Sequence, residues 1–297
     1  MADINPQDPQ SANQYDDRTT AAVKSVLVEI GQILGSFQGK YAVIGGAVPW
    51  LLLDNLEMPH VGTIDVDLSL NAEALGDGEY VRLVEALMTN GYDQNKDLKK
   101  FQLVRTIAAA DGGSPVDIIV DFLMPRDAKI DRNKPPILDD FAVQRADGAD
   151  LAMHFNQLVA VRGSMPKGGI NTVEIVVCSI PALLAMKGHA IQRRYKQKDA
   201  YDIYYCVRNF PGGPVALAEV CRPLLDDPVA RDGYTRIAAK FRAEDEFGPH
   251  TVSVFLGESG GFNDMSPEQV RVDAYRQVRT WLEALGLAHQ SREEDQP

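Results

Sequence analysis

The sequence has few of the features that mark membrane or exported proteins. It contains no run of about 18 apolar residues, the length that a membrane-spanning helix needs. Residues 1–17, MADINPQDPQSANQYDD, have neither the basic stretch nor the apolar stretch of a signal peptide. We therefore expect a protein of the cytoplasm without a membrane span. Residues 1–17 are expected to form a disordered leader, because they are rich in Pro, Gln, Asn and Asp.

Cysteine and histidine are also scarce. Cys178, Cys206 and Cys221 are odd in number and widely spaced. That pattern argues against a disulfide framework and indicates a reducing compartment. The five histidines show no paired spacing, so the sequence does not predict a zinc site.

Basic residues are outnumbered by acidic ones, 30 against 42, which gives a net charge of −12. This balance disfavours broad coating of nucleic acid, which depends on neutralising phosphates. It leaves room for an RNA end that enters one local basic site. The apolar content of 45% is ordinary for a globular protein with a packed core.

The most informative stretch runs from Tyr41 to Leu70. It predicts a strand, a turn at Gly45-Gly46, a short apolar helix, a loop and a second strand that carries Asp65 and Asp67. Residues two apart on a strand share a face, so these carboxylates project together, roughly 6.6 Å apart along the backbone. Paired carboxylates are the ligands that Mg²⁺ or Mn²⁺ prefers.

The glycine turn adds a phosphate-binding feature to this stretch. Backbone amides without a neighbouring Cβ can approach a ligand closely, and the first amides of a helix attract phosphate. Gly45-Gly46 followed by Asp65 and Asp67 therefore predicts a nucleoside triphosphate with its metal. The alternative is an ordinary glycine turn and two solvated acids at the end of a strand.

A third carboxylate is expected on the hairpin that follows. Phe101 to Ala108 and Val116 to Leu123 read as its two strands. Asp121 lies in an apolar run, where an acid is costly unless it is paired or bound to metal. Asp117 is four residues away on the same face and lies next to the turn. We prefer Asp121 and keep Asp117 as the alternative.

A second charged group lies within Pro181 to Asn209. Lys187 is followed by a basic connector and then by Lys198, Asp199 and Asp202. The two aspartates are three apart and share a helical face. Phosphate transfer needs cations that offset charge on the phosphoryl oxygens. The alternative is a solvated charged connector between two helices.

These motifs resemble the nucleotidyltransferase superfamily that includes DNA polymerase β. The likeness is strongest to the AbiEii/AbiGii-type toxin nucleotidyltransferases of type IV toxin–antitoxin systems. It rests on two sets of residues, Gly45, Gly46, Thr63, Asp65 and Asp67 in the first and Lys187, Lys198, Asp199 and Asp202 in the second. Two positions depart from the family pattern, since Val61 stands where an Arg is common and Ala47 where a Ser or Thr is common.

The resemblance implies an α/β (α+β) fold, with a mixed β-sheet and flanking helices followed by a helical C-terminal bundle. We expect the nucleotidyltransferase domain at residues 18–180, the helical domain at 181–290 and a disordered tail at 291–297. Helices are expected at 18–35, 79–90, 214–225, 226–244 and 267–287, and strands at 151–161 and 171–178. Thr19 or Thr20 is expected to cap the first helix, and Ser266 the last.

The expected reaction is Mg²⁺- or Mn²⁺-dependent transfer of a nucleoside monophosphate from an NTP to a hydroxyl group. Asp65, Asp67 and Asp121 are the expected metal ligands. Gly45, Gly46, Thr63, Lys187, Lys198 and Asp202 are the expected nucleotide-binding residues. Lys187 and Asp199 are expected to take part in catalysis with the three metal ligands.

The resemblance also implies an acceptor and partners. The acceptor would be RNA, such as a tRNA 3′ end, or a protein hydroxyl, and the role would be growth arrest or phage defence with a cognate antitoxin. One alternative is a nucleotidyltransferase that modifies a small cationic molecule such as an aminoglycoside, which the acidic net charge would suit. Another is an inactive module that binds a nucleotide or a partner, for which the departures at Ala47 and Val61 leave room.

Overall fold

The computed structural model describes residues 9–53, 55, 57–71, 78–94, 97–108, 113–126, 143–194, 196–257 and 265–288. The chain divides into two compact units. The sheet unit comprises Tyr15–Leu52 and Val61–Leu183, and the helical unit comprises Met1–Gln14, Leu53–His60 and Leu184–Pro297. The expected tail and residues 1–8 of the expected leader lie outside the described residues. Ala12–Gln14, also within the expected leader, form a 3-10 helix.

The sheet unit contains a seven-stranded sheet in the order β3-β4-β2-β1-β7-β6, with β5 paired to β4. Its pairings are mixed, because β2–β4, β1–β7 and β4–β5 are parallel and β1–β2, β3–β4 and β6–β7 are antiparallel. The mixed sheet with flanking helices confirms the expected fold class. The strands are β1 Tyr41–Ile44, β2 Asp65–Leu70, β3 Gln102–Ile107, β4 Val116–Pro125, β5 Gln144–Ala146, β6 Asn156–Ser164 and β7 Ile170–Cys178.

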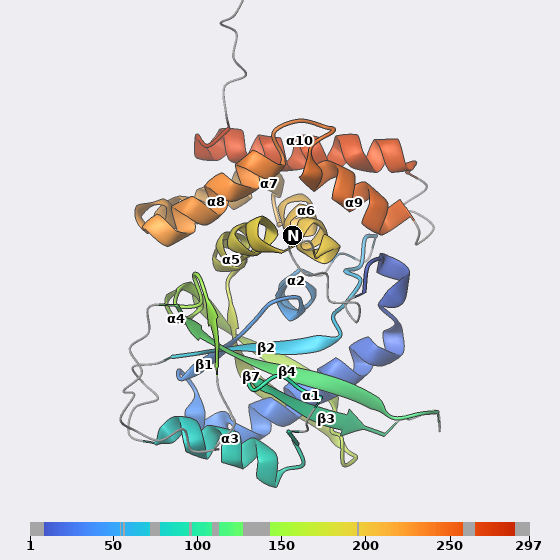
Figure 1. Cartoon of the computed structure of the whole chain (residues 1–297), viewed down its shortest axis with the longest axis vertical. Helices are drawn as coiled ribbons and strands as arrows, with labels where there is room; N and C mark the ends of the chain where they lie inside the picture. Colours follow the sequence, from blue (N-terminus) through green and yellow to red (C-terminus); the bar gives the residue numbers. More distant parts are fainter. Residues whose placement is uncertain are drawn as a thin grey trace, which may run out of the picture. The chain divides into compact units, whose positions relative to one another are not determined.

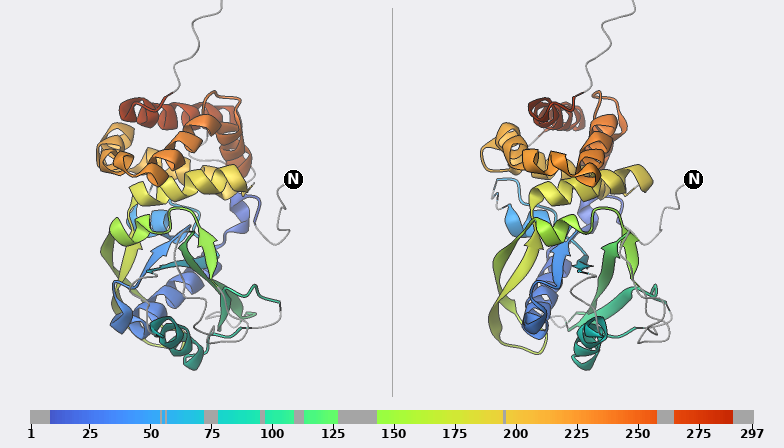
Figure 2. Two further views of the ribbon diagram at one scale, coloured as in Figure 1. Left: turned by 60° about the vertical axis from the view of Figure 1, so that its left-hand side comes forward. Right: turned by 90° about the vertical axis from the view of Figure 1, so that its left-hand side faces the viewer.

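Helix α1 (Asp17–Ile33) packs along one face of this sheet, beside α3 (Glu79–Thr89) (Figures 1 and 2). Its buried residues are Ala22, Val23 and all of 25–31, so the second half of the helix is covered around most of its circumference. The contact is close at Gly31, where an added Cβ would lie 2.7 Å from side-chain atoms of Val173 and Ile175. The cap expected at Thr19 or Thr20 is wrong, because Asp16 accepts the amide of Thr19 and begins the helix earlier.

The sheet unit also contains α2 (Ala47–Leu52), which follows the glycine turn, and α4 (Leu151–His154). The expected strand at 151–161 is therefore wrong over its first residues. They form a helical turn, and β6 begins only at Asn156 and continues to Ser164. Strand β5 lies in the segment between β4 and α4, of which residues 127–142 lie outside the described residues.

The helical unit is built around an aromatic core. Fully buried side chains include Tyr201, Tyr204 and Tyr205 on α6 (Gln197–Asn209), and Trp281 stacks edge-on against Tyr234 with centroids 5.3 Å apart. Helix α10 packs against both α7 and α9. The other helices are α5 Ile180–Arg193, which begins in the sheet unit, α7 Gly213–Cys221, α8 Pro228–Lys240, α9 Phe247–Gly257 and α10 Pro267–Leu285.

Two glycines let α5 and α8 approach to backbone contact. A Cβ on Gly188 would lie 1.9 Å from the carbonyl oxygen of Gly233, and a Cβ on Gly233 would lie 2.3 Å from that of Ala185. His189, next along α5, contacts the carbonyl of Val229 on α8 at 2.9 Å. The position of α5, which carries Lys187, is therefore set by backbone packing against α8.

Candidate active site

Two of the expected metal ligands face each other on paired strands of the sheet unit. Asp67 on β2 is in register with Asp121 on β4, and Asp121 is in register with Gln102 on β3. Paired residues of neighbouring strands share a face and lie about 4.8 Å apart. Gln102 donates its side-chain amide to Asp121 at 2.8 Å. A row of polar side chains therefore crosses three strands at this level of the sheet.

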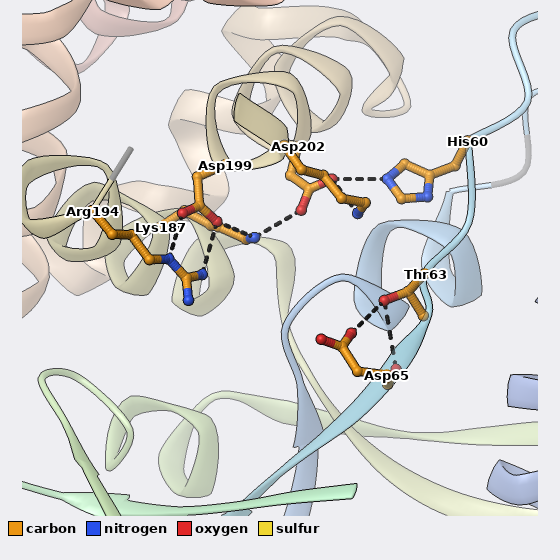
Figure 3. A network of polar contacts seen from close by, with 8 residues as sticks. His60, Thr63, Asp65, Lys187, Arg194, Asp199 and Asp202 are labelled. Carbon is orange, nitrogen blue, oxygen red and sulfur yellow. Dashed lines mark hydrogen bonds and ion pairs between the residues drawn. The ribbon is translucent and has the colours of Figure 1, made fainter. Parts of the chain in front are cut away.

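Asp65 lies two residues before Asp67 on the same half-buried face of β2. Buried Thr63 donates its hydroxyl to Asp65 Oδ1 at 2.8 Å, which fixes one orientation of the carboxylate (Figure 3). The intervening Val66 points into the core and is fully buried. The alternation predicted for this strand is thus present, with the acids on one face and the apolar residues on the other.

Asp117, the alternative third acid, has a different environment. It is exposed, lies opposite Thr106 on β3, and accepts the Thr106 hydroxyl at 2.6 Å. Asp121 is half-buried and is opposite Asp67. The register therefore brings Asp121 beside the Asp65–Asp67 pair and places Asp117 farther along β4.

The glycine turn lies against one of these carboxylates. Gly45 follows β1 with a φ of 72°, a conformation that residues with a Cβ rarely adopt. A Cβ at this position would lie 1.9 Å from Asp67 Oδ2. Gly45 thus leaves the space that the Asp67 side chain occupies. The sequence pattern alone indicated close approach of a ligand here, and the structure adds a close approach of a carboxylate.

The donor set suits a hard divalent cation, because three carboxylates of one sheet face supply oxygen ligands only. Within the described ranges, no group of three or more Asp, Glu, His or Cys side chains is gathered so that it could hold a metal ion. Asp65 and Asp121 are instead held by Thr63 and Gln102. Joint coordination would therefore require rotation of side chains on strands whose register is already set.

The second set of expected site residues forms a buried ionic network in the helical unit. Asp199, fully buried, accepts Lys187 Nζ at 2.7 Å and a bidentate pair of bonds from Arg194 at 2.7 and 3.0 Å. Figure 3 shows Arg194 and Lys187 meeting at this carboxylate from two directions. Bidentate arginine–carboxylate contacts are among the stronger hydrogen-bonded pairs in proteins.

Asp202, one turn farther along α6, is the second centre of this network. Its Oδ1 accepts Lys198 Nζ at 2.8 Å, and its Oδ2 lies 2.7 Å from Lys187 Nζ. The same Oδ1 contacts the imidazole Nε2 of His60 at 3.0 Å. Lys187 therefore bridges the two aspartates. The network, defined as His60, Lys187, Arg194, Lys198, Asp199 and Asp202, has three cationic and two anionic side chains.

Burial and pairing act against each other on the pKa values of these groups. Burial alone would raise the pKa of Asp199, but Arg194 and Lys187 outweigh it and hold that pKa well below its ordinary value. Asp202 behaves in the same way, with Lys187 and Lys198 as the partners. Both aspartates are therefore anionic at neutral pH.

The two lysines differ from each other. Burial opposes the charge of Lys187, but Asp199 and Asp202 outweigh it and raise its pKa. Burial lowers the pKa of Lys198, and the negative charge of Asp202 offsets only part of this effect. Lys187 is thus the firmly charged member of the pair.

His60 and Gln102 were not identified by the sequence analysis as site residues. His60 contacts Asp202 across 142 positions of sequence, and Gln102 reaches Asp121 only in the register of the β3–β4 hairpin. No local pattern encodes either contact. A histidine three residues before Thr63 is the only sequence signal that could have pointed to His60.

Comparison with known families identifies a match over most of the chain. The family described as "Nucleotidyl transferase AbiEii toxin, Type IV TA system" matches residues 62–251. That range includes Thr63, Asp65, Asp67, Asp121, Lys187, Lys198, Asp199 and Asp202. A comparison with curated proteins found no match.

Two solved structures from Helicobacter pylori are similar over most of their length. The structure of JHP933 is 12% identical, with a TM-score of 0.43, over 91% of this chain and 94% of that one. A protein described as a candidate nucleotidyltransferase is 10% identical, with a TM-score of 0.44, over 91% of this chain and 98% of that one. Within the part of the chain that the structure describes, no helix is both long and apolar enough to cross a membrane.

Proposed function

Because the chain belongs to the AbiEii family of nucleotidyl transferase toxins of type IV toxin–antitoxin systems, we propose a specific reaction for it. The chain is a nucleotidyltransferase, and the proposal concerns its donor, metal and acceptor. It transfers a nucleoside monophosphate from an NTP, with Mg²⁺ or Mn²⁺, to the hydroxyl of an RNA such as a tRNA 3′ end, or of a protein. In this proposal a cognate antitoxin opposes the growth arrest that results.

The register of Asp67 with Asp121, with Asp65 on the same face, is the observation that carries the proposal. Once their side chains rotate toward one another, the three carboxylates would repel one another unless a cation offset their charge. They would hold divalent metal, which when bound stabilises both the attacking and the leaving oxygen of a phosphoryl transfer. Thr63 keeps Asp65 oriented, and Gln102 keeps Asp121 oriented.

The roles of the remaining sheet residues follow from their positions. The backbone amides of Gly45 and Gly46 bind the phosphates in this proposal. Neither glycine carries a side chain, and an unobstructed backbone is what close approach of a phosphate needs. Gly45 has a second role, because it leaves room for the Asp67 carboxylate.

The helical unit contributes positive charge. Lys187 is buried and firmly protonated, and in this proposal it stabilises the charge of the departing pyrophosphate. Asp199 and Asp202 hold its ammonium group from two sides. Lys198 binds the nucleotide phosphates in this proposal. Asp202 forms an ion pair with Lys198 and offsets part of the lowering of its pKa by burial.

The test is a labelling screen. Purified protein is incubated with each labelled NTP, with Mg²⁺, Mn²⁺ or EDTA, and with total RNA, cell protein or an aminoglycoside. We expect metal-dependent label in the RNA or the protein. The double variant Asp65→Asn/Asp67→Asn should lose transfer by about a hundredfold or more, because the metal ligands are removed.

The matched control is Glu85→Gln/Glu174→Gln, which removes the same charge from two exposed positions of the sheet unit and should keep transfer. Label in the aminoglycoside alone would replace the macromolecular acceptor with a small molecule. Equal transfer by the aspartate variant and wild type would contradict the proposed site.

A further inference from the structure

A short segment of the chain is bound along one face of α6. The described residues of Leu53–His60, called the strap here, contact α6 at Asp202, Tyr205 and Asn209. These positions are three and four residues apart, so they lie on one helical face. Tyr205 donates its hydroxyl to the carbonyl of Leu53 at 3.4 Å, and the Asn55 side chain bonds that of Asn209 at 2.6 Å. The strap ends at His60.

The imidazole of His60 is held in one orientation. The centroid of its ring lies 4.7 Å from that of Tyr205, in an edge-on arrangement, and 5.3 Å from that of Tyr201. Its side chain is 1% exposed. Nε2 is 3.0 Å from Asp202 Oδ1, and because Asp202 is anionic, that nitrogen carries the proton and donates.

The imidazole is the neutral member of an otherwise ionic network. Burial, with the positive charge of Lys198, lowers the pKa of His60 to about 4. The ring therefore donates a hydrogen bond to Asp202 without adding charge beside the two lysines. Asp202 Oδ1 receives this bond and that of Lys198, and Oδ2 remains for Lys187. The bond thus fixes which oxygen faces which ammonium group.

Packing of the strap does not by itself require a histidine at this position. Tyr205 and Asn209 already bind the strap at Leu53 and Asn55. An apolar side chain would fill a seat between two aromatic rings without the cost of burying a polar group. The presence of a histidine at position 60 is explained by its hydrogen bond to Asp202.

We propose that His60 is a positioning residue of nucleotidyl transfer, which orients Asp202 so that Lys187 and Lys198 are held ready for the triphosphate. This inference rests on the proposed function. His60 acts through Asp202 and forms no bond with the substrate. The loss of its hydrogen bond therefore weakens nucleotide binding and turnover while the fold remains.

The test compares three substitutions in the full-length protein. His60→Gln places an amide nitrogen near the position of Nε2, His60→Asn is too short to reach Asp202, and His60→Leu removes the donor. Binding of each labelled NTP with Mg²⁺ is measured by equilibrium dialysis, and kcat/KM by label transfer. We expect roughly tenfold to hundredfold weaker NTP binding for Asn and Leu, the size of a lost hydrogen bond to a charged group. Gln should stay close to wild type.

The matched control is Tyr205→Phe. It removes the hydrogen bond to Leu53 but keeps the ring against His60, so a purely structural strap would lose as much from this change as from His60→Asn. We expect Tyr205→Phe to bind NTP as wild type does. If His60→Leu does not fold, the comparison of His60→Asn with His60→Gln tests the proposal. Both side chains are polar amides, and only the longer one reaches Asp202.

A second measurement separates positioning from packing. In the Lys187→Met background the bridge to Asp202 is absent, so adding His60→Asn should weaken NTP binding by a smaller factor than it does in wild type. Equal factors in the two backgrounds would overturn the proposal, as would wild-type binding and kcat/KM in His60→Asn. A wild-type protein that neither binds nor transfers any NTP would instead overturn the proposed function, and the positioning role with it.

Discussion

Asp67 and Asp121 lie opposite each other in the parallel pairing of β2 with β4, although 53 residues, 68–120, lie between them in the sequence. Parallel strands cannot be joined by a tight turn, so this contact depends on the whole crossover between them. The crossover includes α3 and β3. The register that brings the two carboxylates together is therefore a property of the folded sheet.

Substitution of the two candidate third acids should give opposite results. Asp121→Asn removes a carboxylate beside Asp67 and should lower nucleotidyl transfer by about a hundredfold. Asp117→Asn, on the same strand but exposed and bonded to Thr106, should leave transfer within about threefold, as an exposed substitution does. Label transfer at saturating NTP and metal checks both, with circular dichroism as the control for folding. The assignment of Asp121 fails if the two variants exchange these results.

Substitution of two glycines by alanine should distinguish the effect of backbone strain from the effect of steric crowding at the site. Gly39 and Gly45 both have positive φ, 81° and 72°, and Gly39 has no atom within 4 Å of an added Cβ. Gly39→Ala should cost about 1–2 kcal/mol of unfolding free energy from strain alone. Gly45→Ala should cost more and should also reduce transfer, because its Cβ would displace Asp67. Urea unfolding and label transfer measure the two effects; retained transfer in Gly45→Ala would show that Asp67 can move without loss.

The contact of α5 with α8 should tolerate no side chain. Gly188→Ala places a Cβ against the backbone of Gly233, so the helices must separate, at a cost of about 2–4 kcal/mol of unfolding free energy. Gly35→Ala is the control, because nothing lies within 4 Å of its Cβ and its φ is not positive. That control should change the unfolding free energy by less than about 0.5 kcal/mol. Equal midpoints of urea unfolding would show that α5 adjusts.

Acid should destabilise the protein through His60 before it does so through the aspartates. The pKa of His60 is lowered by burial from 6.5 to about 4, so between these values the unfolded chain binds a proton that the folded chain does not. Stability is then complete above about pH 6.5 and falls as the pH drops toward 4, by up to about 3 kcal/mol. The lowered pKa values of Asp199 and Asp202 contribute stability that is lost only below about pH 4.

The check is the unfolding free energy at pH 7 and pH 4.5 for wild type and His60→Gln. The variant cannot titrate at this position, so its loss between the two pH values should be smaller. An equal loss in both proteins would show that the imidazole does not titrate in this window.

Local patterns predicted much of the fold. The strands of the β3–β4 hairpin lie where alternation indicated them, and Ser266 caps α10 in a capping box with Gln269. Both depend on residues close in sequence, for which periodicity and capping rules hold. The alternation of Asp65, Val66 and Asp67 likewise predicted which side chains share a face.

The errors fall where the local signal is ambiguous. Leu151–His154 read as part of a strand because a short apolar run suits either structure. Helix α9 was not expected, because its glycine, proline and β-branched residues have low helix propensity. Its buried face, which includes Val252 and Phe255, outweighs that propensity once the other helices are present.

The candidate site was predictable in its residue types and not in its contacts. Carboxylates on one strand face follow from the period of a strand, but the network of Lys187, Asp199 and Asp202 depends on how α5 meets α6. The seat of His60 between two tyrosines depends on a segment distant in sequence. Such contacts are properties of tertiary packing, which a single sequence does not specify locally.

The strap has a consequence for any chimaera assembled from this protein and a relative. A crossover placed at residue 183, before the remainder of the helical unit, would take Lys187, Lys198 and Asp202 from one parent and His60 from the other. His60 of one parent would then contact Asp202 of the other, whose neighbouring residues evolved with a different strap. An exchange of intact units therefore requires that Leu53–His60 and the C-terminal helices come from the same parent. The segment would be inserted into the N-terminal part of the other parent.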